Sequence, residues 1–390
     1  MKILAVETSC DETALALIEA KGDFLIKNRS ASARVGGWQI KILKNLVASQ
    51  IKIHRPFGGV VPNLAKREHL RNLPLLWQRI MNKEVRIKNK NKKTIIHNSK
   101  FIIPDLIVVT VGPGLEPALW TGINFAKELQ KIKNKKIKIV GANHLEGHLY
   151  SFLLEKKIAV SNVNPPAGGQ MSNVFPAIAL LVSGGHTILV KMDSLVKYKK
   201  IGETRDDAIG EAFDKVARLL NLPYPGGPEI EKLAKKGNSS AINFPRPMLN
   251  QKNYDFSFSG LKTSVLYYLR DLNPKPKTQN LKPDIAASFQ QAAFDVLIKK
   301  TLRAANEFKA KSIFISGGVA ANKTLQQQFK LNINPPHPPI GGDGQISKVK
   351  FFAPSKNFCG DNAAMIAVAG YINYLQKKNR RLIANGNLGI

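Results

Sequence analysis

The fold class is decided by the stretch Ala177-Ile-Ala-Leu-Leu-Val-Ser-Gly-Gly-His186, in which an apolar run leads directly into a Gly-Gly turn. A short apolar run that ends in turn residues predicts a buried strand. The same form returns at Ile315-Ser-Gly-Gly-Val319. Glycine lets the backbone approach a ligand closely, and the amides of such a turn can face phosphate or carboxylate oxygens. One Gly-Gly turn is usually only a turn, but two at equivalent strand ends indicate a nucleotide cleft between two related domains.

Strand-like and helix-like segments alternate on either side of these turns, which is typical of an α/β protein. Strands are predicted at residues 3–8, 14–19, 107–111, 137–140, 177–182 and 312–315, and helices at 62–80, 117–130, 207–220, 286–305 and 361–375. Loops rich in Pro, Asn or Gly are predicted at residues 163–175, 273–282 and 332–348. The first two strands are expected to form a hairpin with Asp11 and Glu12 at a solvated tip. These two carboxylates could also organise a cation or transfer protons.

The composition of the chain excludes several classes of protein. At 390 residues and 44% hydrophobic content, the chain can bury a sizeable core, which argues against a disordered basic tail. No apolar run approaches the ~20 residues that cross a membrane, and the first residues lack the pattern of a signal peptide. Two cysteines, Cys10 and Cys359, cannot make a disulfide framework, and Cys10 has no evident base partner. A cytoplasmic protein without a membrane partner is therefore expected.

The charge of the chain points to a polyanionic partner. Lys and Arg number 59 against 27 Asp and Glu, a net charge of +32. About a third of this excess lies in two lysine-rich runs, at residues 82–100 and 127–138. Nucleic acid is the simplest partner for such a surface, and a solvated lysine-rich surface fits equally well. The first run lacks aromatic residues between its lysines, so it offers phosphate contacts rather than base stacking.

A candidate metal site is indicated by the sequence His144-Leu-Glu-Gly-His148. On a helix the two imidazoles lie one turn apart on one face, a spacing that suits two ligands of one cation. The Glu stands in the third position rather than the second, so the segment differs from the His-Glu-x-x-His pattern of zinc proteases. Asp361 is the candidate third ligand, although its place before an apolar helix also fits a helix N-cap. Zinc or ferrous iron would fit such a set.

Three further segments are candidates for ligand contacts. Asp214 can accept hydrogen bonds from both hydroxyls of a ribose, or it can pair with Arg218 one helical turn away, which is favoured without further context. Pro225-Gly-Gly-Pro228 predicts a rigid loop over a ligand, and Gly112-Pro-Gly-Leu115 predicts a third close approach of the backbone.

Taken together, these segments resemble the tRNA N6-adenosine threonylcarbamoyltransferase family (TsaD in bacteria). The matches run in family order from about residue 1 to 375 and comprise Val6-Glu-Thr-Ser-Cys-Asp-Glu-Thr13, Gly58-Gly-Val-Val-Pro62, Gly112-Pro-Gly-Leu115, Asn143-His-Leu-Glu-Gly-His148, Leu181-Val-Ser-Gly-Gly-His186, Asp206-Asp-Ala-Ile-Gly-Glu-Ala-Phe-Asp-Lys215, Tyr224-Pro-Gly-Gly-Pro228, Phe256-Ser-Phe-Ser-Gly-Leu-Lys262, Ser316-Gly-Gly-Val-Ala-Ala-Asn322 and Asp361-Asn-Ala-Ala-Met-Ile366. Two positions depart from the family: Asn63 stands where Glu is usual, and Gly360 where Thr is common.

The resemblance implies an α/β protein of the actin/Hsp70/sugar-kinase-like (ASKHA) fold, with two domains and an interdomain nucleotide cleft. The first domain is expected at residues 1–140 plus 362–390, with a basic insertion at about 82–103. The second is expected at residues 141–361, with insertions at about 163–176 and 332–349. The implied activity is transfer of the threonylcarbamoyl group of threonylcarbamoyl-AMP to N6 of adenosine 37, in the anticodon loop of tRNAs reading ANN codons, with release of AMP.

The resemblance also assigns residues and partners. His144, His148 and Asp361 would hold one divalent metal ion per subunit, Fe2+ in first place and Zn2+ as the alternative. The adenylate-binding positions would be Leu181, Val182, Ser183, Gly184, Gly185, Asp214, Gly227 and Asn322, and Glu231 falls where some members have an additional acidic contact. Asp11 and Glu12 match a pair of acids for which a catalytic or partner-contact role is expected. Bacterial members work with a smaller inactive paralogue (TsaB) and an ATPase (TsaE).

Three other classes of protein remain as alternatives. An ATPase or kinase of the same superfold would have a similar cleft, but such kinases usually use carboxylates and Mg2+. A metalloprotease is disfavoured by the position of the Glu between the two histidines. A non-enzymatic nucleic-acid-binding protein would account for the charge, but neither for the pair of Gly-Gly turns nor for the metal set.

Overall fold

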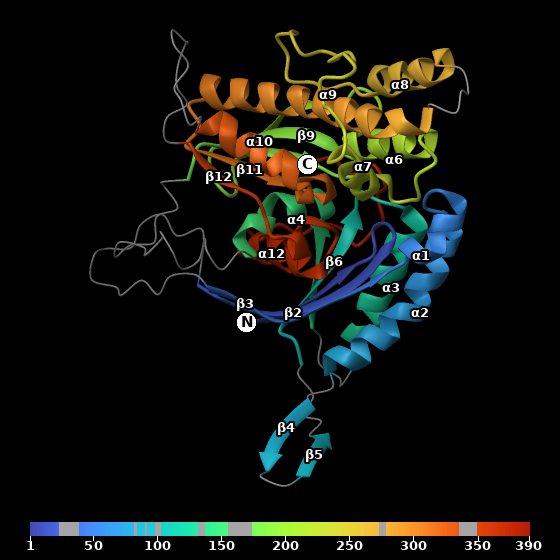
Figure 1. The fold of residues 1–390 in the computed structure, drawn as a ribbon. Helices are drawn as coiled ribbons and strands as arrows, with labels where there is room; N and C mark the ends of the chain where they lie inside the picture. The colour runs from blue at the N-terminus through green and yellow to red at the C-terminus, as the bar shows by residue number, and fades with distance from the viewer. Residues whose placement is uncertain are drawn as a thin grey trace. The chain divides into compact units, whose positions relative to one another are not determined.

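The computed structural model describes residues 1–22, 39–81, 84–89, 92–97, 103–131, 137–154, 174–272, 278–334 and 349–390. The chain forms two compact units (Figure 1). Unit 1 comprises Met1–His54, Val60–Gly169 and Asp361–Ile390, and unit 2 comprises Arg55–Gly59 and Gln170–Gly360. The helix that carries the two histidines thus lies in unit 1, and so does Asp361. The predicted boundaries placed both in the second domain. The assignment of domains itself stays a prediction.

Unit 1 is built on a five-stranded sheet of order β3-β2-β1-β6-β7. Its strands are β1 (Lys2–Glu7), β2 (Glu12–Lys21), β3 (Gln39–Ser49), β6 (Leu106–Gly112) and β7 (Lys138–Asn143). The first three pair antiparallel, and β6 and β7 continue the sheet parallel to β1. Helices α2 (Pro62–Met81) and α3 (Glu116–Gln130) pack apolar side chains against Leu4 and Val6 of β1. Helix α12 (Ala363–Leu375) packs against the sheet so closely that a Cβ on Gly370 would meet Val108 at 2.2 Å.

Unit 2 repeats this topology with the order β10-β9-β8-β11-β12. Its strands are β8 (Ala177–Val182), β9 (Thr187–Met192), β10 (Tyr198–Glu203), β11 (Ser312–Ser316) and β12 (Lys350–Phe352). Again three strands pair antiparallel and two continue parallel. The helices are α6 (Ile209–Leu219), α7 (Gly226–Ala234), α8 (Ser259–Asp271), α9 (Thr278–Glu307) and α10 (Lys323–Ile333). The ring of Phe213 on α6 contacts the rings of Phe289 and Phe294 on α9, with centroids 5.0 and 5.9 Å apart.

Two details of the predicted elements are corrected by the structure. Helix α9 begins at Thr278, so the loop predicted to run to residue 282 is wrong over its last five residues. The prediction rested on the Pro and Asn content of residues 273–282, but the helix begins within them and even includes the following Pro283. Strand β3 was not predicted, because it is only partly buried and carries Lys and Asn among its apolar residues.

The predicted insertions lie largely outside the described residues. Within the first of them the structure describes a hairpin of β4 (Glu84–Asn89) and β5 (Lys92–His97), which pair antiparallel (Figure 1).

The carboxyl ends of parallel strands meet at one edge of each sheet. In unit 1 this edge brings together Glu7 at the end of β1, Thr110 near the end of β6, and the residues after β7, where helix α4 (His144–Tyr150) begins. In unit 2, Leu181 pairs with Ser316, so the Gly-Gly turns after β8 and β11 lie next to each other. The candidate site residues of each unit therefore gather where an open α/β sheet usually binds ligands.

Candidate metal centre and nucleotide-binding turns

The two histidines lie on the short helix α4, directly after β7. The side chain of Asn143 caps this helix by accepting hydrogen bonds from the Leu145 amide (2.7 Å) and the Glu146 amide (3.4 Å). The cap fixes the first turn, and the imidazoles of His144 and His148 then lie side by side with ring centroids 4.7 Å apart. Both rings are buried. The helical spacing predicted from the sequence is confirmed.

Asp361 is brought to this pair from the far end of the sequence. Its Oδ1 atom lies 3.1 Å from His148 Nε2 and 3.5 Å from His144 Nε2. The interpretation of Asp361 as an N-cap is wrong, because Asn362 caps α12 by accepting a hydrogen bond from the Met365 amide at 3.1 Å. Two imidazoles and a carboxylate are thus combined in one buried place.

The distances from both imidazoles to Asp361 are compatible with a single cation. The three ligand atoms all lie within 4.8 Å of one another. Ligands bound at about 2.0–2.2 Å to one ion are roughly 3 to 3.5 Å apart, which agrees with the two distances to Asp361 Oδ1. Nitrogen and carboxylate donors in this number suit Zn2+ or Fe2+ and leave coordination positions open. The residues present therefore could bind a metal ion.

The charges around the site also favour a cation. Burial alone lowers the pKa of His144, but the carboxylates of Asp361 and Glu7 raise it to about 9. Burial raises the pKa of Glu12 well above its usual value, and the neighbouring charges of Asp11 and Asp361 raise it further. The part of this rise that comes from Asp11 and Asp361 reflects negative charge gathered beside Glu12, which a divalent ion would neutralise.

The tip of the first hairpin is not solvated as expected. Asp11 is only 7% exposed and Glu12 is half-buried. The buried side chain of His69 contacts the tip through both ring nitrogens. Its Nε2 lies 2.9 Å from the Cys10 carbonyl oxygen, and its Nδ1 lies 2.8 Å from Thr13 Oγ1. Burial raises the pKa of the Cys10 thiol well above its usual value, and Asp11 raises it further, so the thiol stays protonated. This agrees with giving Cys10 no nucleophilic role.

In unit 2 the first Gly-Gly turn lies against the start of α6. The Ser183 amide donates to the His186 carbonyl at 2.8 Å and closes the turn. A Cβ on Gly210 of α6 would meet the Ser183 carbonyl oxygen at 2.6 Å, whereas among the described residues no atom lies within 4 Å of a Cβ added to Gly184 or Gly185. Packing therefore explains the glycine at position 210, while the glycines of the turn itself face open space.

The other predicted ligand residues lie on the neighbouring helices. The Asp214 carboxylate accepts a hydrogen bond from the Gly226 amide at 2.6 Å, which places Gly227 close by. Asn322 is buried and caps α10 through the Leu325 amide, while its amide group donates to Gln290 at 2.9 Å. Glu231 accepts from the Lys323 amide at 3.1 Å. Asn63, the departure from the family, is exposed in the first turn of α2.

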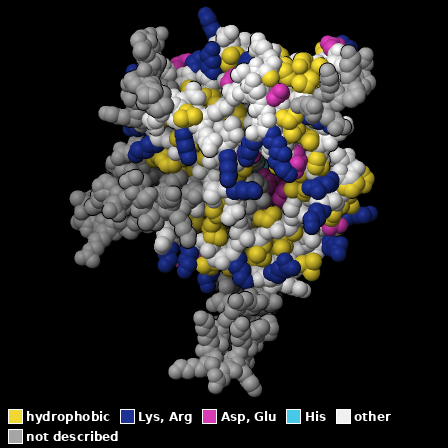
Figure 2. Space-filling view, viewed as in Figure 1, with side chains coloured by type: hydrophobic (Ala, Val, Ile, Leu, Met, Phe, Trp, Pro, Cys, Tyr) yellow, Lys and Arg dark blue, Asp and Glu magenta, His cyan; other side chains and the backbone are white. Residues whose placement is uncertain are grey.

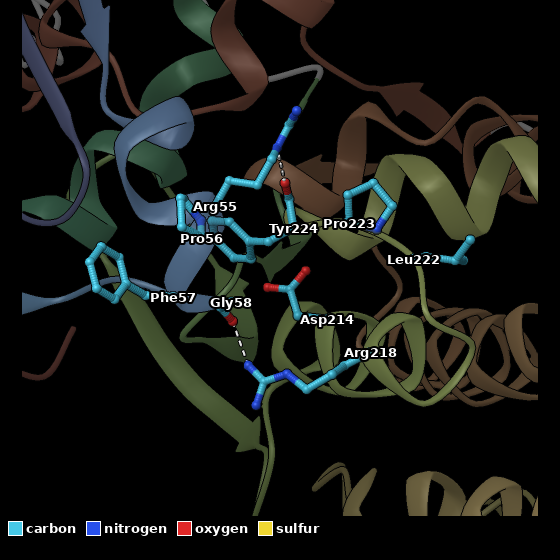
Figure 3. A pocket seen from close by; sticks show the side chains of 9 residues that line it. All are labelled: Arg55, Pro56, Phe57, Gly58, Asp214, Arg218, Leu222, Pro223 and Tyr224. Carbon is cyan, nitrogen blue, oxygen red and sulfur yellow. Dashed lines mark hydrogen bonds between the residues drawn. The ribbon is translucent and has the colours of Figure 1, made fainter.

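Asp214 also lines a cavity of about 410 Å³ (Figure 3). The opposite wall is the short segment Arg55–Gly58, of which the sequence analysis noted only Gly58, and gave it no ligand role. Arg55 Nε donates to the Tyr224 carbonyl at 2.9 Å, and Arg218 donates to the Gly58 carbonyl. The remaining lining residues are Pro56, Phe57, Leu222 and Pro223. Gly58 has a φ of +66°, a backbone conformation that favours glycine. A glycine in the sequence indicates such a turn, but it does not identify the residues that the turn contacts.

Comparison with known proteins places the chain in a family. The family model for tRNA N6-adenosine threonylcarbamoyltransferase matches residues 41–368. The protein of that name from Thermosipho melanesiensis is 43% identical over 376 residues, which cover 95% of this chain and 94% of the relative. The one from Dictyoglomus turgidum is 40% identical over 390 residues, covering 100% of this chain and 98% of the relative.

Two solved structures of HypF proteins are similar in fold. The crystal structure of T. kodakarensis HypF has a TM-score of 0.51 at 14% identity, covering 97% of this chain and 48% of that chain. Full-length HypF in its phosphate- and nucleotide-bound form has a TM-score of 0.53 at 11% identity, covering 98% of this chain and 56% of that chain. This chain thus spans about half the length of these structures, and the likeness concerns the fold alone.

Two α/β units of one topology define a protein of the ASKHA-like fold class, so the predicted architecture of two related α/β domains is confirmed. The chain belongs to the tRNA N6-adenosine threonylcarbamoyltransferase family, because the family model spans most of its length and relatives at about 40% identity cover it almost completely. Its activity is that of the family, an acyl transfer to tRNA, and the substrates of the family are tRNA and threonylcarbamoyl-AMP. Among the helices of the described residues, none combines the length and the apolar character needed to span a bilayer.

Proposed function

We propose that the chain transfers the threonylcarbamoyl group of threonylcarbamoyl-AMP to N6 of adenosine 37 in tRNAs that read ANN codons, and releases AMP. The observation that carries this proposal is the convergence of His144 Nε2, His148 Nε2 and Asp361 Oδ1 in a chain of this family. A cation held by three protein ligands keeps positions for the oxygens of a substrate.

The proposed cofactor is one divalent metal ion per subunit. Two histidines and one carboxylate with open positions are typical of Fe2+ sites, and Zn2+ accepts the same donors. Fe2+ is therefore the first candidate and Zn2+ the second. When bound, such an ion polarises a carbonyl oxygen as a Lewis acid. The buried side chains around it hold the ligands in place and keep water away from the reacting groups.

The adenylate end of the donor is assigned to the predicted residues of unit 2, Leu181, Val182, Ser183, Gly184, Gly185, Asp214, Gly227 and Asn322. The open turn at Gly184 and Gly185 offers backbone amides to a phosphate, and the Asp214 carboxylate can accept hydrogen bonds from ribose hydroxyls. Gly227 leaves room for a ligand, because a Cβ there would meet no described atom within 4 Å. Asn322 has a supporting role, since its side chain is already used in the cap of α10.

The proposed reaction needs positioning more than a strong base. The N6 amine attacks the carbamoyl carbon, the bond from that carbon to the phosphate oxygen breaks, and AMP leaves with the electron pair. The amine loses one proton, and we assign it to Glu12, with Asp11 beside it. A carboxylate whose pKa is raised is, in its ionised form, a stronger base than an ordinary one, and a cation at the metal centre would favour that form. Because AMP is a good leaving group, orientation of the two substrates supplies much of the rate.

The proposed partners are the anticodon loop of tRNA, a smaller TsaB-like paralogue and a TsaE-like ATPase. The cytoplasm is the proposed location, because the tRNA substrate is there. Figure 2 shows a face on which Lys and Arg side chains clearly outnumber Asp and Glu, in keeping with the net charge of +32. Such a surface attracts RNA phosphates without reading their sequence.

Affinity for tRNA is expected to fall as salt rises. A lysine that neutralises a phosphate releases a counterion. Each such lysine therefore steepens the negative slope of log K against log salt by about 0.7 to 0.9. The double change Lys127→Gln and Lys131→Gln, at the exposed end of α3, should lower this slope by roughly one to two. Filter binding of tRNA across a salt series measures it, with Lys330→Gln on α10 as the matched control. An unchanged slope would assign these lysines to the solvated surface.

Metal binding is expected to be pH-dependent through His144. In the metal-free protein its pKa is about 9, because Asp361 and Glu7 outweigh the effect of burial. Below that pH the imidazole carries a proton that the metal must displace, so apparent affinity should rise with pH up to about 9, by roughly tenfold per unit. Calorimetry with Zn2+ in buffers of different ionisation enthalpy should show about one proton released at pH 7. Equal affinities at pH 7 and pH 9 would contradict this.

Reconstitution tests the proposed function directly. Labelled threonine, bicarbonate, ATP, a donor synthase, the two candidate partners and tRNA are combined with and without this chain. Label is expected at adenosine 37 only when the chain is present, and Glu12→Gln should slow a single turnover while leaving metal binding intact. Label that reaches tRNA without the chain, or a position other than adenosine 37, would overturn the proposal.

A further inference from the structure

A carboxylate to which the sequence analysis gave no role lies directly behind the first histidine. Glu7 is the last residue of β1 and is fully buried. Its Oε2 lies 3.1 Å from His144 Nδ1 and accepts a hydrogen bond from Thr110 Oγ1 at 2.7 Å. Its Oε1 accepts one from the Ser9 amide at 2.5 Å. Each of these partners comes from a different segment, so the carboxylate is held in one place.

The contact decides which nitrogen of His144 is free for a metal ion. An ionised carboxylate is a stronger acceptor than a hydroxyl, so Nδ1–H donates to Glu7 rather than to Ser9 Oγ, which is also 3.1 Å away. With its proton on Nδ1, the ring has its lone pair on Nε2. That is the nitrogen that faces Asp361 Oδ1. The second histidine has no such support, because His148 Nδ1 is buried without a hydrogen-bond partner among the described residues.

We propose that Glu7 is the positioning residue of the metal centre: it fixes the tautomer and the ring orientation of His144 and so presents Nε2 to the cation. The inference rests on the proposed metal role of His144, His148 and Asp361. Carboxylates placed behind metal-binding histidines commonly contribute 10- to 100-fold to metal affinity. The alternative is a structural role, in which Glu7 only joins β1 to β6 through Thr110.

The test compares Glu7→Gln with Thr110→Val in the full chain. Glutamine keeps the shape of glutamate but only one of its two oxygens, so it removes the charge that faces His144 together with one of the hydrogen bonds from Thr110 and Ser9. Valine at position 110 removes one hydrogen bond to Glu7 and leaves the carboxylate in place. Zn2+ affinity is measured by competition with a chelator at one fixed pH for the wild type and both variants. The unfolding midpoint of the metal-free protein is measured alongside.

We expect Glu7→Gln to weaken Zn2+ binding by about 10- to 100-fold and Thr110→Val by clearly less, with similar unfolding midpoints. If the wild-type protein binds Zn2+ and Glu7→Gln binds it equally tightly, the role of Glu7 is overturned while the metal centre itself stands. A wild-type protein that binds no divalent ion would overturn the metal centre as well. Should Glu7→Gln fail to fold, nuclear magnetic resonance of zinc-bound wild type decides, because a His144 proton on Nε2 instead of Nδ1 contradicts the inference.

Discussion

Replacing His148 by alanine should abolish threonylcarbamoyl transfer and metal binding together. The imidazole Nε2 of this residue lies 3.1 Å from Asp361 Oδ1, and the ring is 1% exposed, so the variant loses a buried ligand, one of the three. Stabilisation of a developing negative charge by a metal ion contributes several kcal/mol, which corresponds to roughly a thousandfold or more in rate. His144→Ala should have the same effect, since it also removes one of the three ligands.

The measurement needs a control for the loss of a buried histidine. His54 is suitable, because it lies in unit 1, is completely buried and bonds to Gln50 Oε1 at 3.1 Å. His54→Ala is expected to lower the unfolding midpoint while keeping one bound metal ion per subunit. Metal content by elemental analysis and single-turnover transfer are measured for both variants. Full transfer by a folded, metal-free His148→Ala protein would exclude the metal from the reaction.

The sequence predicted the histidine pair but left the role of Asp361 undecided. Local spacing is enough for two ligands on one helix, because their geometry depends only on the helical repeat. Asp361 and Asn362 are both good capping residues at the start of an apolar helix, and only the fold shows that Asn362 makes the cap and leaves Asp361 to face the imidazoles. A third ligand from a distant segment depends on tertiary structure, which no local pattern contains.

Glu7 was missed for a related reason. It ends an apolar strand, and its partner His144 is 137 positions away in the sequence. A charged residue at the end of a buried strand is a useful signal, but it does not identify the partner. The role of Arg55–Gly58 as a wall of the cavity beside Asp214 was missed in the same way, because the side chains of Arg55 and Arg218 donate to backbone carbonyls, which any residue can offer. Strands and helices with strong apolar patterns were predicted well, whereas the edge strands β3, β10 and β12 and the helices α7 and α8 were not predicted.

The second large effect is expected at Gly317, in the turn after β11. This residue has a φ of +92°, and a Cβ there would lie 2.3 Å from the carbonyl oxygen of Val182, far inside any real contact. Gly317→Ala must therefore move the end of β8 or change its own backbone conformation. Strain of this kind costs about 3 kcal/mol or more in the free energy of unfolding. Since Val182 leads into the turn at Gly184 and Gly185, the variant should also lose affinity for AMP.

Gly318 provides the matched control, because it is the next residue and no described atom lies within 4 Å of a Cβ placed on it. Gly318→Ala should change the free energy of unfolding by less than about 0.5 kcal/mol, as ordinary exposed substitutions do. Urea unfolding and AMP binding are measured for both variants. If the two alanine variants were equally stable, the close approach of the two turns would be wrong. If Gly317→Ala alone lost both stability and AMP, the paired Gly-Gly turns would be shown to serve packing and ligand binding at once: Gly317 brings β11 against β8, and the glycines after β8 keep their space for a phosphate.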